Sequence, residues 1–149
     1  TVLYRNGCCK VPYILTHHLK SNLVGIDLVN EIFAFFVSKL EQLRSCGVEE
    51  VVLDVGFGFG KDLTQNFQIL HFLEEFKKLN CPLLVGLSRK RMVWQTLGIT
   101  PNEALNGTTV LNTIALLNGA NILRVHDVAE ARQVVDLVYE YNEANNISL

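Results

Sequence analysis

The chain has 149 residues and a formal net charge of −2, with 49% hydrophobic and 19% charged residues. This length allows one domain with a substantial core, but a closed eight-stranded βα barrel typically needs about 250 residues. The apolar composition argues against disorder, and the slightly acidic balance does not favour broad nucleic-acid binding. No apolar run reaches the roughly 18 residues that a membrane span needs. We therefore expect no membrane partner, and the charge balance leads us to expect no nucleic-acid partner.

The cysteines favour a reducing compartment. The first residue is Thr1 rather than Met. No basic segment followed by an apolar one opens the chain, so we expect no secretory leader. The segment from Val2 to Cys9 is typical of the end of a preceding helical unit. No C-x-x-C motif occurs, so we expect reduced thiols in a cytoplasmic protein. The four cysteines are Cys8, Cys9, Cys46 and Cys81.

Short apolar runs alternate with longer segments of helical period. The runs predict four strands, at Tyr13–Leu15, Val51–Asp54, Leu83–Val85 and Asn121–Val125. The helical segments are Leu28–Cys46, a helix capped by Thr64 and continuing to Leu79, a region from Lys90 to Leu117 that breaks near Gly98 and Pro101, and Ala129–Asn142. Within the third of these, Asn106 to Thr109 has the pattern of a capping turn.

The βα order repeats four times and therefore predicts a parallel sheet with right-handed crossovers. Units of roughly 37 residues would reach roughly 300 residues in eight copies, which is within the range of βα barrels. The polar motifs all follow strand ends, where parallel βα folds bind ligands. The sequence thus predicts half of a (β/α)₈ barrel.

A glycine-rich stretch from Asp54 to Lys61 is the densest motif. Its glycines alternate, so they do not fit the dinucleotide-binding G-x-G-x-x-G pattern. Lys61 is followed by Asp62 rather than Ser or Thr, so the stretch is not a P-loop either. Two interpretations remain for Asp54. It caps a turn, or its buried carboxylate accepts two parallel N–H donors from a flat heterocycle.

Basic residues follow the third and fourth strands. The run Ser88 to Arg91 is either a solvated basic turn or a contact for an anion. Arg124 and His126 are two residues apart on the predicted fourth strand, so they share a face and together suit a phosphate or a flat ring. Because His17 and His18 are adjacent and point in opposite directions, a metal site there is not favoured.

Taken in order, these motifs resemble the dihydropteroate synthase family. The matching stretches are DVGFGFGK followed by Gln65-Asn66, then GLSRK, then RVHDV, and similarity extends from about Val11 to Val138. This family of (β/α)₈ barrels joins p-aminobenzoate to 6-hydroxymethyl-7,8-dihydropterin pyrophosphate, with Mg²⁺, and is the target of sulfonamides. The resemblance implies that residues 1–149 are the carboxyl-terminal half of such a barrel, strands five to eight, without an internal domain boundary.

The resemblance also implies ligand contacts for individual residues. Asp54 would accept hydrogen bonds from the pterin, Gly86 would let the backbone approach it, and Arg124 would stack on its face. Lys90 would donate to the pterin and border the p-aminobenzoate pocket, which Phe59 also lines. Catalytic roles are implied for Lys90, Arg124 and His126.

Pyrophosphate binding is implied for Arg89, Arg124 and His126. Cations that hold a departing anion lower the barrier to its release, and no covalent nucleophile is needed.

Three positions depart from the family pattern, because Val55 replaces a common Pro, Thr16 a common Met and Arg91 a frequent Ser. That Ser helps to hold the p-aminobenzoate carboxylate, so Arg91 either replaces it by charge or disturbs the pocket. No residue here matches the family's first-strand metal ligand or its mobile loops. We therefore expect no metal ligand in this chain, an inactive isolated fragment, and a homodimer for the complete protein.

Two other functions remain open at this point. The first is a methyltransferase-type homologue that binds a pterin without the condensation, against which the pair Arg124 and His126 argues. The second is a non-catalytic half-barrel that pairs with another chain, because four βα units leave open sheet edges.

Overall fold

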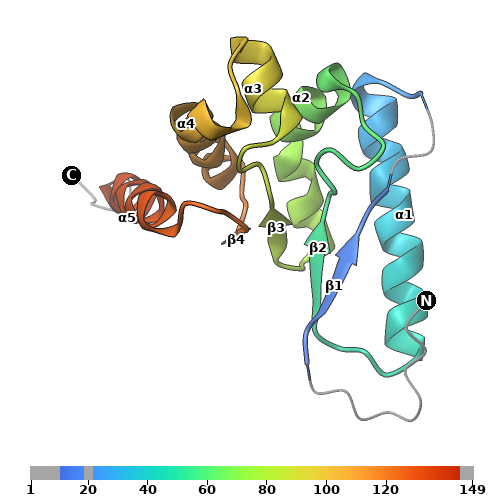
Figure 1. Ribbon diagram of the computed structural model, residues 1–149. Coiled ribbons are helices and arrows are strands. Elements are labelled where there is room, and N and C mark those ends of the chain that lie inside the picture. The colour runs from blue at the N-terminus through green and yellow to red at the C-terminus, as the bar shows by residue number, and fades with distance from the viewer. Residues whose placement is uncertain (1–10, 19–21, 145–149) are drawn as a thin grey trace.

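The computed structural model describes residues 11–18 and 22–144. They form a parallel sheet whose strand order, β1-β2-β3-β4, follows the chain (Figure 1). The strands are β1 (Tyr13–Thr16), β2 (Val51–Asp54), β3 (Leu83–Val85) and β4 (Ile122–Leu123). The predicted parallel α/β architecture is confirmed. The interpretation of Val2 to Cys9, with two of the four cysteines, lies outside the described residues.

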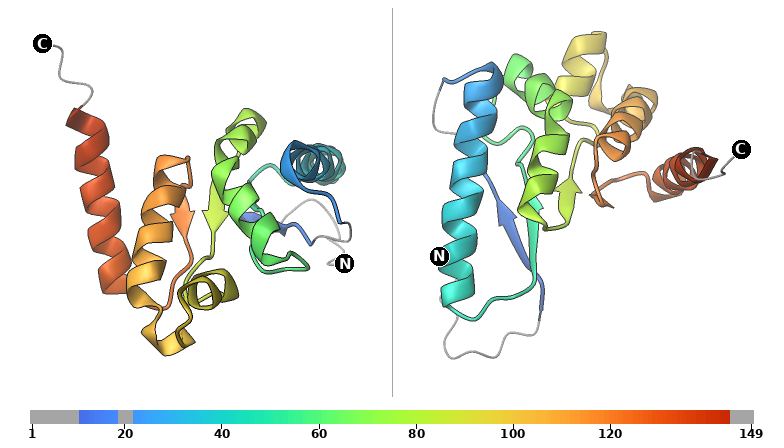
Figure 2. Two further views of the ribbon diagram at one scale, coloured as in Figure 1. Left: turned by 90° about the horizontal axis from the view of Figure 1, so that it is seen from above. Right: turned by 180° about the vertical axis from the view of Figure 1, so that it is seen from behind.

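Helices connect and follow the strands. They are α1 (Gly25–Ser45), α2 (Leu63–His71), the 3₁₀ helix η1 (Leu73–Leu79), α3 (Arg91–Leu97), the 3₁₀ helix η2 (Pro101–Glu103), α4 (Leu105–Leu117) and α5 (Val128–Ala144). Helices α1 and α2 cover one face of the sheet, as the view from behind shows (Figure 2). Within the described residues, no helix is long and apolar enough to cross a membrane.

The core lies between the sheet and these helices, because alternate strand residues point to opposite faces. Leu15 is 7% exposed and packs in the core, whereas its neighbour Ile14 is 49% exposed on the other face. Leu53, Ile32 and Phe36 are fully buried in the same cluster. Helices therefore cover one face of the sheet. The described helices do not cover the other face over β1 and β2 (Figure 1).

The second helical segment differs from the prediction at both ends. Thr64 is not the cap. Asp62 is the N-cap, and its side chain accepts from the backbone of Gln65, whose own side chain accepts from the Asp62 N–H. This reciprocal capping box satisfies two free amides of the first turn. Nor does one helix continue to Leu79, because α2 ends at His71 and a separate 3₁₀ helix follows.

Two other expectations are corrected. The fourth strand pairs only over Ile122 and Leu123, so Arg124 and His126 lie beyond its end rather than on one strand face. The stretch from Asn106 to Thr109 is not a turn before a helix, because α4 already begins at Leu105.

Candidate active site

Asp54 ends β2 at the carboxyl edge of the sheet and is 1% exposed. Its Oδ1 accepts a hydrogen bond from the Gly56 N–H at 2.8 Å, and its Oδ2 accepts one from Nη2 of Arg124 at 3.0 Å. The Thr16 hydroxyl, at the end of the neighbouring strand, is 3.5 Å from the same Oδ2. One oxygen of Asp54 thus caps its own turn, as the first interpretation predicts, and the other pairs with the guanidinium of Arg124. The contact with a flat heterocycle stays a prediction.

The glycine-rich loop after Asp54 needs its glycines for conformation and for space. Gly56, Gly58 and Gly60 have φ of 72°, 78° and 70°, a region that side chains with a Cβ disfavour. A Cβ at Gly56 would lie 1.9 Å from the carbonyl oxygen of His17. The alternation of glycines therefore lets this loop pack directly on the end of β1.

Lys61 holds this loop in place. Its Nζ donates to the carbonyl oxygens of Gly56 at 2.9 Å, His17 at 3.2 Å and Phe59 at 3.2 Å. Burial lowers the pKa of Lys61 to about 8, although the nearby carboxylate of Asp54 acts in the opposite direction. The lysine that ends the glycine motif is thus a clamp between the loop and β1.

Of the two loop phenylalanines, one faces the core and one faces the site. Phe57 is 1% exposed, whereas Phe59 is 40% exposed and lies with its ring centroid 4.8 Å from Nζ of Lys90. Burial lowers the pKa of Lys90, the cation of Arg124 lowers it further, and Asp54 opposes both. Phe59, Lys90, Arg124 and Asp54 therefore share one region at the edge of the sheet.

Arg124 crosses from the end of β4 to Asp54 by passing over a glycine. A Cβ at Gly86 would lie 3.1 Å from Nη2 and 3.2 Å from Nε of Arg124. The side chain of Arg124 is 51% exposed, although its partner carboxylate is buried. Gly86 therefore provides the space in which the guanidinium reaches Asp54 while one side stays open to solvent.

Neighbouring residues after β3 hold the segment after β4. Ser88 Oγ accepts the backbone N–H of His126 at 3.2 Å and lies 2.9 Å from its Nδ1. The Arg89 guanidinium donates through Nε and Nη2 to Asp127, at 3.1 and 2.6 Å. Both arginines are thus paired with a carboxylate, but the side chain of Arg124 is 51% exposed and that of Arg89 is 32% exposed.

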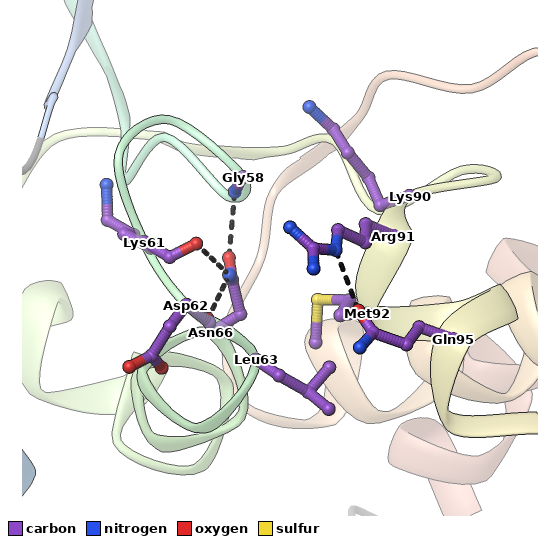
Figure 3. A pocket seen from close by; sticks show the side chains of 9 residues that line it. All are labelled: Gly58, Lys61, Asp62, Leu63, Asn66, Lys90, Arg91, Met92 and Gln95. Atoms are coloured by element: carbon purple, nitrogen blue, oxygen red, sulfur yellow. Dashed lines mark hydrogen bonds between the residues drawn. The ribbon is translucent and has the colours of Figure 1, made fainter.

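A pocket of about 400 Å³ lies beside this cluster, between the glycine-rich loop and α3. Figure 3 shows the Arg91 guanidinium in it, held by a 2.7 Å hydrogen bond from Nε to Oε1 of Gln95. Asn66 forms the opposite wall and accepts the Gly58 N–H at 2.8 Å. Lys90 also borders this pocket, but Phe59 and Asp54 are not among its lining residues.

The two adjacent histidines differ in environment. His17 is 3% exposed, its ring stacks edge-on against Phe35 at 4.9 Å, and its Nδ1 has no hydrogen-bond partner. Burial, with the charge of Lys61, lowers the pKa of His17 to about 4. His18 is exposed and lies 6.3 Å from the Phe59 ring. Within residues 11–18 and 22–144, no three His, Cys, Asp or Glu side chains gather where they could hold a metal.

Several site residues were not identified from sequence. The sequence places Lys61 and Asp127 in the matching motifs without a contact for either, and it places Thr108 in the expected capping turn. Lys61 contacts Phe59, two residues away, but also Gly56 and His17, which lie 5 and 44 residues away. Asp127 pairs with Arg89, which is 38 residues away. Only the alternation of buried strand ends and polar turns pointed towards them.

Fold and site together define an α/β protein whose candidate site lies at the carboxyl ends of parallel strands, where TIM-barrel enzymes bind their ligands. The chain belongs to the pterin-binding enzyme family, because residues 9–126 match the family described as "Pterin binding enzyme".

Named relatives are dihydropteroate synthases. The chain is 41% identical over 114 residues to that of Escherichia coli K12, covering 75% of this chain and 40% of the relative. It is 35% identical over 127 residues to the bifunctional dihydropteroate synthase/dihydropteroate reductase of Helicobacter pylori, covering 85% and 33%. The chain thus spans less than half the length of these relatives.

Solved structures agree with this assignment. The Yersinia pestis dihydropteroate synthase has a TM-score of 0.84 at 38% identity, covering 89% of this chain and 55% of that chain. The same enzyme in complex with a sulfonamide drug has a TM-score of 0.85 at 36% identity, covering 90% and 52%. The Clostridium difficile enzyme, solved in the presence of pteroic acid, has a TM-score of 0.80 at 35% identity, covering 85% and 49%.

Proposed function

We propose that the protein containing this chain is a dihydropteroate synthase of folate biosynthesis. It would condense p-aminobenzoate with 6-hydroxymethyl-7,8-dihydropterin pyrophosphate to give 7,8-dihydropteroate and pyrophosphate. The observation that carries the proposal is the buried carboxylate of Asp54, paired with Arg124 beside Lys90 at the strand ends of a chain that belongs to the pterin-binding family.

In the proposed reaction, the pterin lies against Asp54 and over Gly86. Its amino group and ring N–H would replace the guanidinium of Arg124 as donors to the Asp54 carboxylate, freeing Arg124 to stack on the ring. The half-exposed position of Arg124 supports such a movement. Lys90 would donate to the pterin from its present place beside Phe59.

The chemical step breaks the C–O bond to pyrophosphate and forms a C–N bond from the p-aminobenzoate amine to the same methylene. The amine then loses one proton, and the C–O electron pair leaves with pyrophosphate. Arg124 and His126 would bind that anion, and cations placed where negative charge develops lower the barrier.

We place p-aminobenzoate in the pocket next to the glycine-rich loop, which is lined by Lys90, with Phe59 packed against that lysine. Arg91 would hold the carboxylate there, in place of the Ser common at this position, because its guanidinium already lies in the pocket. Sulfonamides, which are bound in the related Yersinia pestis enzyme, would compete for the same space.

Mg²⁺, which the family uses, would neutralise charge on the pyrophosphate when bound. The described residues do not fit a Mg²⁺ site, because no three acidic, histidine or cysteine side chains converge in them. No step of this mechanism is therefore assigned to a metal.

We also propose that these residues are the carboxyl-terminal half of one barrel, its strands five to eight, with no internal domain boundary. The consecutive order of four parallel strands supports this arrangement. A homodimer and a cytoplasmic location are part of the same proposal, and the free thiols of Cys46 and Cys81 are consistent with a reducing compartment.

The direct test is to incubate the full-length protein with both substrates and Mg²⁺ and to measure dihydropteroate. We expect product formation that depends on the pyrophosphate of the pterin substrate. If no product forms at high enzyme concentration, the proposal is wrong. Equal affinity for the pterin with and without its pyrophosphate would instead favour a pterin-binding homologue without this activity.

A further inference from the structure

The contact between the ends of β3 and β4 continues beyond the strands through side chains. The strands pair with an offset of 38 residues, Val85 opposite Leu123. The same offset joins the next polar contacts, from Ser88 to His126 and from Arg89 to Asp127. Two short strands are therefore extended by two side-chain contacts in an unchanged register.

The second of these contacts has the geometry of a strong ion pair. Nε and Nη2 of Arg89 each donate to a different oxygen of Asp127, at 3.1 and 2.6 Å. The side chains of Arg89 and Asp127 are 32% and 17% exposed. Two parallel charge-assisted hydrogen bonds fix orientation as well as distance.

The backbone at Arg89 is held in an uncommon conformation. Its φ is 53°, a left-handed value that residues with a Cβ rarely adopt. Its N–H donates to Oγ1 of the buried Thr108 in α4, at 3.1 Å. Such a conformation persists where surrounding contacts determine it, and here an α4 hydroxyl and the Asp127 carboxylate do so.

We propose that Arg89 and Asp127 form a positioning pair, and that Arg89 is not a ligand of the substrate anion. The pair fixes the turn that begins α3, and so Lys90, relative to the segment that carries Arg124 and His126. Both sides of the site then approach one ligand from fixed positions.

This inference rests on the proposed function for its effect on turnover, but the pair itself does not. It opposes the role that the family resemblance implies for Arg89, which is to bind pyrophosphate. The two roles predict opposite effects of removing the carboxylate. If Arg89 binds the anion, Asp127→Asn frees the guanidinium and leaves pyrophosphate binding equal or tighter. If Arg89 positions the site, the same change weakens it.

The test uses the full-length protein with Asp127→Asn, Arg89→Asp, and the exchanged pair Arg89→Asp with Asp127→Arg. Asp tolerates the left-handed conformation at position 89 better than most residues do. Three quantities are measured: kcat and KM, the Kd of inorganic pyrophosphate by calorimetry, and hydrogen exchange at the His126 amide.

We expect each single variant to lower kcat by about tenfold or more, to raise the pyrophosphate Kd and to speed exchange at His126, since charged hydrogen bonds are lost. The exchanged pair should recover a large part of each loss, which is the signature of direct coupling between two positions. The matched control is Arg132→Gln, because Arg132 and Asp136 form the same kind of pair on the exposed surface of α5. It should change none of the three.

Unchanged or tighter pyrophosphate binding in Asp127→Asn, with no recovery in the exchanged pair, would overturn the proposal and make Arg89 an anion ligand. If the wild-type protein makes no dihydropteroate, the proposed function is wrong. Hydrogen exchange at the His126 amide then still tests whether Arg89 and Asp127 position the segment after β4. Unchanged His126 exchange in both single variants would then refute it.

Discussion

At the scale of single residues, the site is a small set of charges whose environments differ sharply. Asp54 is buried and paired, whereas Arg124 is paired but half exposed. Burial and the charge of Arg124 lower the pKa of Lys90. A ligand that supplies its own N–H donors to Asp54 can therefore displace Arg124 without leaving a buried carboxylate unpaired, which would be costly.

Replacing Asp54 by Asn should weaken pterin binding. The amide keeps the shape of the side chain but loses the charge and one acceptor, so we expect the Kd of 6-hydroxymethyl-7,8-dihydropterin to rise about tenfold to hundredfold. Calorimetry on the full-length protein measures this change. Asp136→Asn, on the exposed surface of α5, is the control. An unchanged Kd in Asp54→Asn would mean that the carboxylate does not bind the pterin.

Lys90→Ala should reduce turnover. The variant loses a charged donor beside Phe59 and Arg124, and a charge-assisted contact of this kind corresponds to about tenfold to hundredfold in kcat/KM. Steady-state kinetics with both substrates measures the loss. Lys78→Ala, an exposed lysine in η1, should behave as wild type. Wild-type kinetics in Lys90→Ala would mean that Lys90 does not touch either substrate.

His17 should make the protein sensitive to acid. Its pKa is about 4 in the folded state and near 6.5 when unfolded, so the unfolded chain binds more protons between these values. Stability should therefore fall as pH drops from 6.5 to 4, by up to roughly 3 kcal/mol. Urea unfolding of wild type and His17→Gln tests this, with the exposed His71→Gln as control. Equal pH dependence in all three proteins would contradict the assignment.

At the scale of elements, the turns after the strands are held by contacts between units of the fold. Lys61 fastens the glycine-rich loop to the end of β1, and Asn66 of α2 binds the same loop through Gly58. Ser88 and Arg89 fasten the segment after β4. The edge of the sheet that carries the candidate site is therefore a set of turns connected to each other.

The glycine-rich loop allows a prediction with an internal control. Gly56→Ala would place a Cβ 1.9 Å from the His17 carbonyl oxygen, at a φ of 72°. Gly47→Ala has a similar φ of 80° but no atom within 4 Å of the new Cβ. Gly47→Ala should cost about 1–2 kcal/mol from backbone strain alone.

Gly56→Ala should cost clearly more, and it should also weaken pterin binding because the loop must move away from β1. Urea unfolding compares the two variants. Equal losses of stability would show that the loop does not pack on β1 as described.

At the scale of the whole molecule, the sheet has two outer strands, β1 and β4, and an open face. Ile14 and Ile122 are 49% and 39% exposed on these strands. Unpaired strand edges with apolar side chains promote association. The described residues thus present surface that the proposed complete barrel would cover.

We expect the isolated 149-residue segment to self-associate in solution and to have no synthase activity. Size exclusion with light scattering measures its mass. Ile14→Lys with Ile122→Lys should reduce the association, whereas Leu137→Lys, at a 72% exposed position of α5, should not. A folded monomer would contradict the half-barrel arrangement.

Much of this fold was predictable from local patterns. The β-branched run before Asp54 and the helical period of the following segments depend on nearest neighbours, so strand order and strand direction followed from the sequence. The cap at Thr64 was predicted wrongly because Asp62, two residues earlier, completes a reciprocal pair with Gln65. The length of β4 was overestimated, because its pairing with β3 covers only Ile122 and Leu123.

By itself, the sequence determined the βα order, the position of the polar motifs at strand ends and the family, because each depends on residue type and spacing along the chain. Only the tertiary structure decided how the charges are shared. Arg124 rather than Arg89 reaches Asp54, while Asp127 engages Arg89. These pairs join residues 70 and 38 positions apart, and which cation meets which carboxylate depends on how neighbouring strands end in space.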